Sequence, residues 1–133
     1  MNIKVLRKIA HKYAPNLKVL YYSPKVFFDI FGTEKYWLYP TRYNRIPCYC
    51  LTHNMIVLPK AIQKHKDKFL IFCHELGHAI LKHGKGNSPN VIYKQELSAW
   101  REGLKVLKQY RPITKQDIKT IKQHSKWLKS QVV

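Results

Sequence analysis

Residues 68–83 have the sequence KFLIFCHELGHAILKH, and this stretch decides how the rest of the chain is interpreted. Its first half, Phe69 to Cys73, is apolar without interruption, and further apolar residues follow on every side. A helix that is apolar all round is normally buried in the core of a protein. Gly84 comes directly afterwards, where a residue that caps the C-terminus of a helix is expected. We therefore predict a buried helix over residues 68–83 that ends at Gly84.

The same stretch contains an HExxH pattern. His74 and His78 are four residues apart, so on a helix they lie on one face and can reach the same metal ion. Glu75 is one step round the helix, where it can hold a metal-bound water rather than the metal. Zinc lowers the pKa of such a water, and a carboxylate can accept its proton and pass it to the leaving amine. The pattern predicts one zinc ion bound by His74 and His78, with Glu75 as the catalytic base.

Gly77 stands between the two histidines, where it costs about 1 kcal/mol of helix stability relative to alanine. Two explanations remain open. Another backbone or a ligand may need to approach closely at this position, or the glycine simply fits tight packing between helices.

A catalytic zinc site of this type needs a third protein ligand, and three residues are candidates. Glu96 is preferred, because it lies at the edge of the apolar face of the next helix, one turn before Trp100. Glu102 lies on the same helix. His83 lies five residues after His78, which places it on the wrong face of a continuing helix. Two histidines, Glu96 and a water would leave the catalytic position open.

The remaining elements follow from apolar periodicity and from turn and cap signals. Thr114 and Asp117 form a capping arrangement, and Ile118, Ile121, Ser125 and Leu128 mark one face of the last helix. The predicted elements are a helix over residues 1–14, strands over 17–22, 48–51 and 54–58, and helices over 68–83, 91–110 and onward from 114.

We therefore predict the α+β class, with residues 1–133 forming a single small zincin-like domain. A short, mostly antiparallel sheet with a hairpin packs on the active-site helix, and a glutamate helix and a C-terminal helix follow. The strand over residues 54–58 could present an edge to an extended peptide, or it could be an ordinary sheet strand. Tyr93, Tyr110 and His124 are candidate donors to the oxyanion of a hydrolytic reaction, with no preference among them.

The chain of 133 residues carries a formal net charge of +18. Such a charge favours anionic partners, including nucleic acid. However, 20 of its 25 basic residues are lysine, which also suits a plainly solvated surface. The aromatic and basic stretch from Tyr36 to Arg45 could stack unpaired bases, although such aromatic residues more often belong to the core.

The N-terminal residues Met1 to Ala14 are charged throughout and do not resemble a signal peptide. No run of about 20 apolar residues is present, so no membrane segment is predicted and a cytoplasmic location is expected. Reduced cysteines suit that compartment, and we expect Cys48, Cys50 and Cys73 to be ordinary strand or helix residues.

HELGHAILKH, followed by Glu96 and Ala99 in ELSAW, resembles the ImmA/IrrE family of zincin-like metallopeptidases. Members carry HExGH, a nearby histidine, here His83, and a glutamate with alanine three residues later. The resemblance covers roughly residues 47–108, and Ser98 stands where the family often has a second acidic residue. It implies a zinc site of the gluzincin type and proteolysis, often of a repressor or regulator in phages or other mobile elements.

The principal hypothesis is thus a zinc metallopeptidase that acts on a protein or peptide, with regulatory and nucleic-acid-associated proteins among the candidate substrates. The alternative is a strongly basic nucleic-acid-binding protein whose zinc is structural or vestigial. A third hypothesis combines the two, since SprT-like proteases associated with DNA also have HExxH and basic surfaces.

Overall fold

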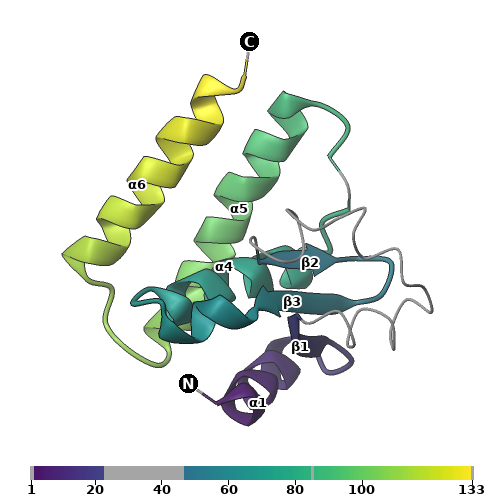
Figure 1. Ribbon diagram of the computed structural model, residues 1–133. Helices are drawn as coiled ribbons and strands as arrows, with labels where there is room; N and C mark the ends of the chain where they lie inside the picture. Colours follow the sequence, from purple (N-terminus) through teal and green to yellow (C-terminus); the bar gives the residue numbers. More distant parts are fainter. Residues whose placement is uncertain (1, 23–46, 85, 133) are drawn as a thin grey trace.

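The computed structural model describes residues 2–22, 47–84 and 86–132 (Figure 1). Its helices are α1 (Ile3–Tyr13), α4 (Lys68–Ile80), α5 (Pro89–Lys108) and α6 (Lys115–Ser130), with the short 3-10 helix η2 (Lys60–Lys64). Its strands are β1 (Lys18–Tyr22), β2 (Cys48–Cys50) and β3 (Met55–Pro59). The class is α+β, as predicted. The Tyr36–Arg45 stretch lies outside the described residues.

The three strands form a mixed sheet in the order β1-β3-β2. The predicted antiparallel hairpin is present, with Tyr49 of β2 opposite Ile56 of β3. The other pairing is parallel, with Val19 of β1 opposite the same Ile56, so the sheet is not mostly antiparallel. β3 is therefore the central strand of the described sheet and offers no edge to a peptide, contrary to one of the two alternatives for residues 54–58. All five of its residues are buried, as expected for a strand covered on both faces.

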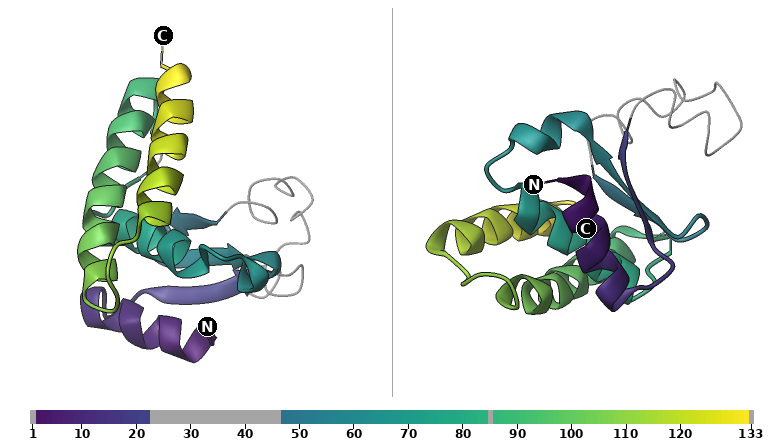
Figure 2. Two further views of the ribbon diagram at one scale, coloured as in Figure 1. Left: turned by 90° about the vertical axis from the view of Figure 1, so that its left-hand side faces the viewer. Right: turned by 90° about the horizontal axis from the view of Figure 1, so that it is seen from below.

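Helix α4 lies between the sheet and α5 and contacts both (Figure 2). Ten of its 13 residues are buried, which explains why its sequence is apolar on nearly every side. The helix ends at Ile80, three residues earlier than predicted. Lys82 adopts the left-handed conformation, with φ of 52°, so the chain turns there and not at Gly84.

Two glycines bring the backbones of α4 and α5 into direct contact. A Cβ atom at Gly77 would lie 2.1 Å from the carbonyl oxygen of Ala99, and one at Gly103 would lie 2.6 Å from that of Cys73. Any side chain at either position would force the two helices apart. The close approach of another backbone is thus the reason for Gly77 within the HExxH pattern.

Helix α6 runs beside α5 in the opposite direction (Figures 1 and 2). The predicted cap is present: the Thr114 side chain accepts from the Asp117 amide, and the Asp117 carboxylate accepts from the Thr114 amide. Arg111 donates two hydrogen bonds to the same carboxylate, at 2.7 and 2.9 Å. These bonds from Arg111 hold the pKa of Asp117 at about 2, despite the opposing effect of burial. This ion pair, of which Asp117 is the buried member, joins the start of α6 to the segment that follows α5.

The inward face of α6 differs in part from the predicted one. Ile118, expected on the buried face, is 39% exposed, whereas Asp117 and Leu128 are buried and His124 is partly buried. These positions have helical spacing, so the inward face is centred on Asp117, Ile121, His124 and Leu128. The sequence pattern predicted Ile121 and Leu128 on this face correctly but missed Asp117 and His124, which are polar.

No helix in the described parts of the chain is long and apolar enough to span a membrane. Cys48 and Cys50 lie on β2 and Cys73 lies inside α4, so all three are strand or helix residues, as predicted. Burial raises the pKa of the Cys73 thiol to about 12, which keeps it protonated and unreactive.

Candidate metal centre

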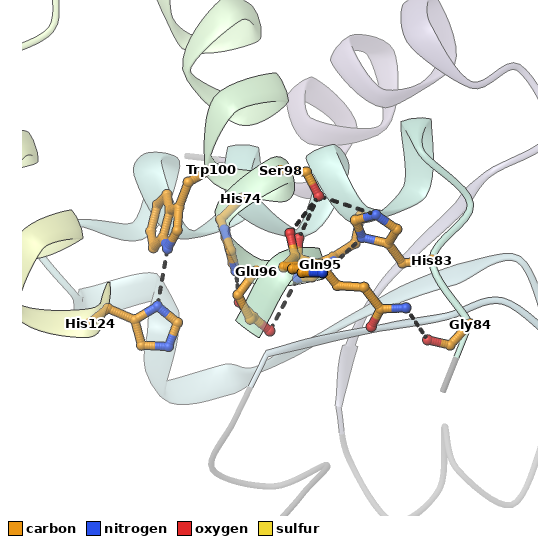
Figure 3. Close-up of polar contacts among 10 residues, drawn as sticks. His74, His83, Gly84, Gln95, Glu96, Ser98, Trp100 and His124 are labelled. Carbon is orange, nitrogen blue, oxygen red and sulfur yellow. Dashed lines mark hydrogen bonds and ion pairs between the residues drawn. The ribbon is translucent and has the colours of Figure 1, made fainter. Parts of the chain in front are cut away.

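Helices α4 and α5 bring His74, His78 and Glu96 together. Figure 3 shows His74 beside Glu96. His74 Nε2 lies 2.6 Å from Glu96 Oε2, and His78 Nε2 lies 3.3 Å from Glu96 Oε1. The three potential ligand atoms all lie within 4.8 Å of one another. In the residues that the structure describes, this is the one group of three or more His, Cys, Asp or Glu side chains that can hold a metal ion.

The other two candidates for the third ligand lie outside this cluster. Glu102 forms an ion pair with Lys105 at 2.9 Å, one turn along α5. His83 contacts His78 through Nδ1 atoms 2.9 Å apart, on the side of the His78 ring that faces away from Glu96. Of the three candidates, Glu96 therefore meets both histidines.

A chain of hydrogen bonds fixes the protonation of His78. Ser98 Oγ donates to the backbone carbonyl of Lys94 at 2.9 Å, because a carbonyl can only accept. Ser98 Oγ is therefore left to accept from His83 Nε2 at 3.4 Å (Figure 3). His83 Nδ1 must then accept the proton of His78 Nδ1. The Nε2 atom of a neutral His78 consequently carries no proton.

This arrangement fits a metal ion. Without a proton on His78 Nε2, two acceptor atoms face each other across 3.3 Å, and a cation between them removes the repulsion. A tetrahedral zinc ion with ligand bonds of about 2.0–2.1 Å separates its ligand atoms by about 3.3 Å. The 3.3 Å between His78 Nε2 and Glu96 Oε1 matches this separation, whereas His74 Nε2 and Glu96 Oε2, 2.6 Å apart, have to separate further to admit such an ion.

The charges of the cluster also suit a cation. Burial lowers the pKa of His74 to about 4, although its hydrogen bond to Glu96 acts in the opposite direction. Burial alone would raise the pKa of Glu96, but its hydrogen bond with His74 and its contact with His78 outweigh burial and leave that pKa well below its usual range. At neutral pH His74 is therefore a neutral imidazole and Glu96 a carboxylate, and together with the His78 imidazole they are typical donors for a divalent transition metal.

His74 is oriented by packing on its other side. Its Nδ1 atom is buried without a hydrogen-bond partner, the one such side-chain atom in the described residues. The Trp100 ring lies against the imidazole, with centroids 3.9 Å apart. Contact with Trp100 thus holds the ring with Nε2 directed at Glu96.

Glu75 lies beside the cluster and is not a member of it. It is buried, and this burial, followed by the charge of Glu96, raises its pKa well above the usual range. A backbone hydrogen bond from Tyr49 of β2 acts in the opposite direction. Glu75 lines a cleft of about 410 Å³ bounded by residues of β2, α4 and α5 and by the loop before α5. The lining residues are Pro47, Cys48, Tyr49, Glu75, His78, His83, Gly84, Gly86, Ile92, Gln95 and Glu96.

The three candidate oxyanion donors have different surroundings. Tyr110 packs edge-on against Phe69 near the start of α4, with ring centroids 5.9 Å apart. Tyr93 does not line the cleft. The ring of His124 lies 5.8 Å from that of His74. Sequence reasoning gave no preference among them, and of the three the structure places His124 beside the cluster.

The site as a whole has two histidines of an HExxH helix, a glutamate from the next helix and a second glutamate, Glu75, that lines the adjoining cleft. Comparison of the chain with protein-family models, with curated proteins and with solved structures yields no match.

Proposed function

We propose that this protein is a zinc-dependent metallopeptidase of the gluzincin type. One observation carries the proposal: His74, His78 and Glu96 converge on one point, and Glu75 lines the cleft beside it. The resemblance of the HELGH and ELSAW segments to the ImmA/IrrE family supports the same reaction class. The two-histidine, one-glutamate donor set is one that catalytic zinc ions use.

Each residue of the site has a separate role in this reaction. Zinc, when bound, supplies a Lewis acid that polarises a carbonyl group and lowers the pKa of water. Glu75 accepts the proton of the attacking water and returns it to the leaving nitrogen as the peptide bond breaks. Glu96 remains ionised and completes the ligand set. Ser98 and His83 hold the ligand nitrogen of His78 without a proton.

The walls of the cleft favour a peptide as the substrate. One wall is formed by the start of β2 and the other by the first half of α5, with Glu75 between them. An extended chain that passes between these walls brings a carbonyl group past Glu75 and Glu96. The substrate class is therefore an extended segment of a protein or peptide.

Removal of zinc tests this function. The zinc-loaded protein is expected to cleave an unfolded protein substrate, to stop when a chelator removes the metal and to recover when zinc is returned. Magnesium should not restore cleavage, because it prefers an octahedral set of oxygen ligands. The products are measured by mass spectrometry. Cleavage that persists in the fully chelated protein would count against the proposal.

A second candidate function, nucleic-acid binding, is favoured by one surface of α6. Five lysines occupy one side of this helix at intervals of three and four residues, and all are exposed. They are Lys115, Lys119, Lys122, Lys126 and Lys129. The one acidic residue of the helix, Asp117, is buried in its ion pair with Arg111. The helix thus presents a row of unopposed positive charge that suits a phosphate backbone.

Salt dependence tests this second candidate. Replacing all five lysines of α6 with glutamine is expected to reduce the slope of log affinity against log salt by about 4 for duplex DNA. Glutamine has a similar helix propensity, so α6 should remain folded. Lys4→Gln with Lys8→Gln, which changes exposed lysines on α1, is the control. An unchanged slope in the α6 variant, measured by fluorescence anisotropy, would rule out this surface.

A further inference from the structure

His124 approaches the metal centre from α6, an element that contributes no ligand. Its imidazole lies 5.8 Å from that of His74 and next to Trp100, which itself packs on His74 (Figure 3). The residue is on the inward face of α6 and is partly buried. It therefore lies beside the metal centre, next to a ligand and not in the wall of the cleft, and the roles assigned above leave it unused.

A hydrogen bond determines which nitrogen of His124 carries a proton. Trp100 Nε1 lies 3.0 Å from His124 Nδ1. An indole N–H can only donate, so Nδ1 must be the acceptor. An imidazolium ring has no acceptor nitrogen, so the ring is neutral and its single proton is on Nε2. The structure thus fixes His124 as a hydrogen-bond donor through Nε2.

The ring is also held in place from its other side. Trp127 stacks on His124, with centroids 6.3 Å apart and an angle of 13° between the rings. Figure 3 shows that the edge bearing Nε2 faces away from Trp100. No described side chain accepts a hydrogen bond from this atom. An oriented donor of this kind, ready before the substrate arrives, is what stabilisation of a developing negative charge requires.

We propose that His124 is a catalytic residue that donates a hydrogen bond from Nε2 to the oxyanion formed when the scissile carbonyl becomes tetrahedral. The inference rests on the proposed peptidase function. His124 keeps its proton throughout. Glu75 transfers the proton from water to the leaving nitrogen, so the proton balance of the reaction does not involve His124. Of the candidate donors named from the sequence, Tyr110 packs against Phe69 near the start of α4, whereas His124 lies against the ligand His74.

The protonation of His124 can be measured without any assay of activity. Nitrogen-15 NMR of the zinc-loaded protein is expected to show a proton on Nε2 and none on Nδ1. Trp100→Phe removes the indole donor and should allow both tautomers. Trp127→Phe is the matched control. It replaces the other tryptophan that packs on His124, but it removes no hydrogen bond to Nδ1. A proton on Nδ1 in the wild type would overturn the proposal.

The catalytic role is tested with His124→Phe, which keeps a ring between the two tryptophans. We expect unchanged zinc content, a fall in kcat of about 10²–10³-fold and weaker binding of a phosphinic peptide, a mimic of the tetrahedral state, by a similar factor. Binding of the cleaved product should change little. If the wild type cleaves the substrate and His124→Phe has the same kcat, the proposed role of His124 is wrong, whereas the peptidase function is not affected. A zinc-loaded wild type that cleaves nothing overturns the peptidase function itself.

Discussion

Glu75→Gln is expected to leave zinc bound and to reduce kcat/KM by about 10²–10⁴-fold, the usual contribution of a general base. Glu75 lies outside the cluster of ligand atoms, so the change should not affect metal affinity. Glutamine has nearly the same size and still accepts the backbone hydrogen bond from Tyr49 that Glu75 now receives. It cannot take a proton from water. Turnover should therefore fall while the fold and the zinc content stay unchanged.

The matched control is Glu102→Gln. It makes the same chemical change on α5, where the carboxylate pairs with Lys105 away from the histidines. Its kcat/KM and zinc content should match those of the wild type. The catalytic role of Glu75 would have to be abandoned if Glu75→Gln cleaved the substrate at the wild-type rate with zinc present.

Gly77→Ala is expected to destabilise the protein and to weaken zinc binding at the same time. The new methyl group would lie 2.1 Å from the Ala99 carbonyl oxygen, so α5 must move away from α4. Overpacking of this kind typically costs about 1–3 kcal/mol, occasionally more. Glu96 is one turn before Ala99 on α5, so its carboxylate moves away from both histidines. Urea unfolding and a competitive zinc titration measure the two effects.

Gly84→Ala is the control for this substitution. A Cβ atom there meets only the Leu51 side chain, at 3.4 Å, which is ordinary contact. The variant should keep wild-type stability and zinc affinity. If Gly77→Ala were equally harmless, the close contact of α4 and α5 would not be what positions Glu96.

The parts of the fold that the sequence predicted well are those decided by neighbouring residues. The apolar run from Phe69 to Cys73 placed α4, and the Thr114 and Asp117 pair placed the start of α6. Preference for Glu96 over Glu102 followed from the apolar face of α5, and the structure brings Glu96 to the histidines. In each case local periodicity or a cap carried the information.

The features that the sequence did not predict depend on contacts between distant segments. The parallel pairing of β1 with β3 joins strands more than 30 residues apart, and no local pattern encodes it. The polar members of the inward face of α6 contact residues outside the helix, Asp117 with Arg111 and His124 with Trp100. The helical spacing of four residues would have indicated this face if polar residues had been counted as part of it. These residues are Asp117, Ile121, His124 and Leu128.

The most direct test of the account is the zinc content of the purified protein, measured by mass spectrometry of the metal for the wild type and for Glu96→Gln. Glu102→Gln serves as the reference. We predict one zinc ion per chain in the wild type and in Glu102→Gln, and a much reduced content in Glu96→Gln, which lacks the ionised ligand. A wild type that binds no zinc, or a Glu96→Gln variant that binds it as tightly as the wild type, would contradict the proposed metal centre.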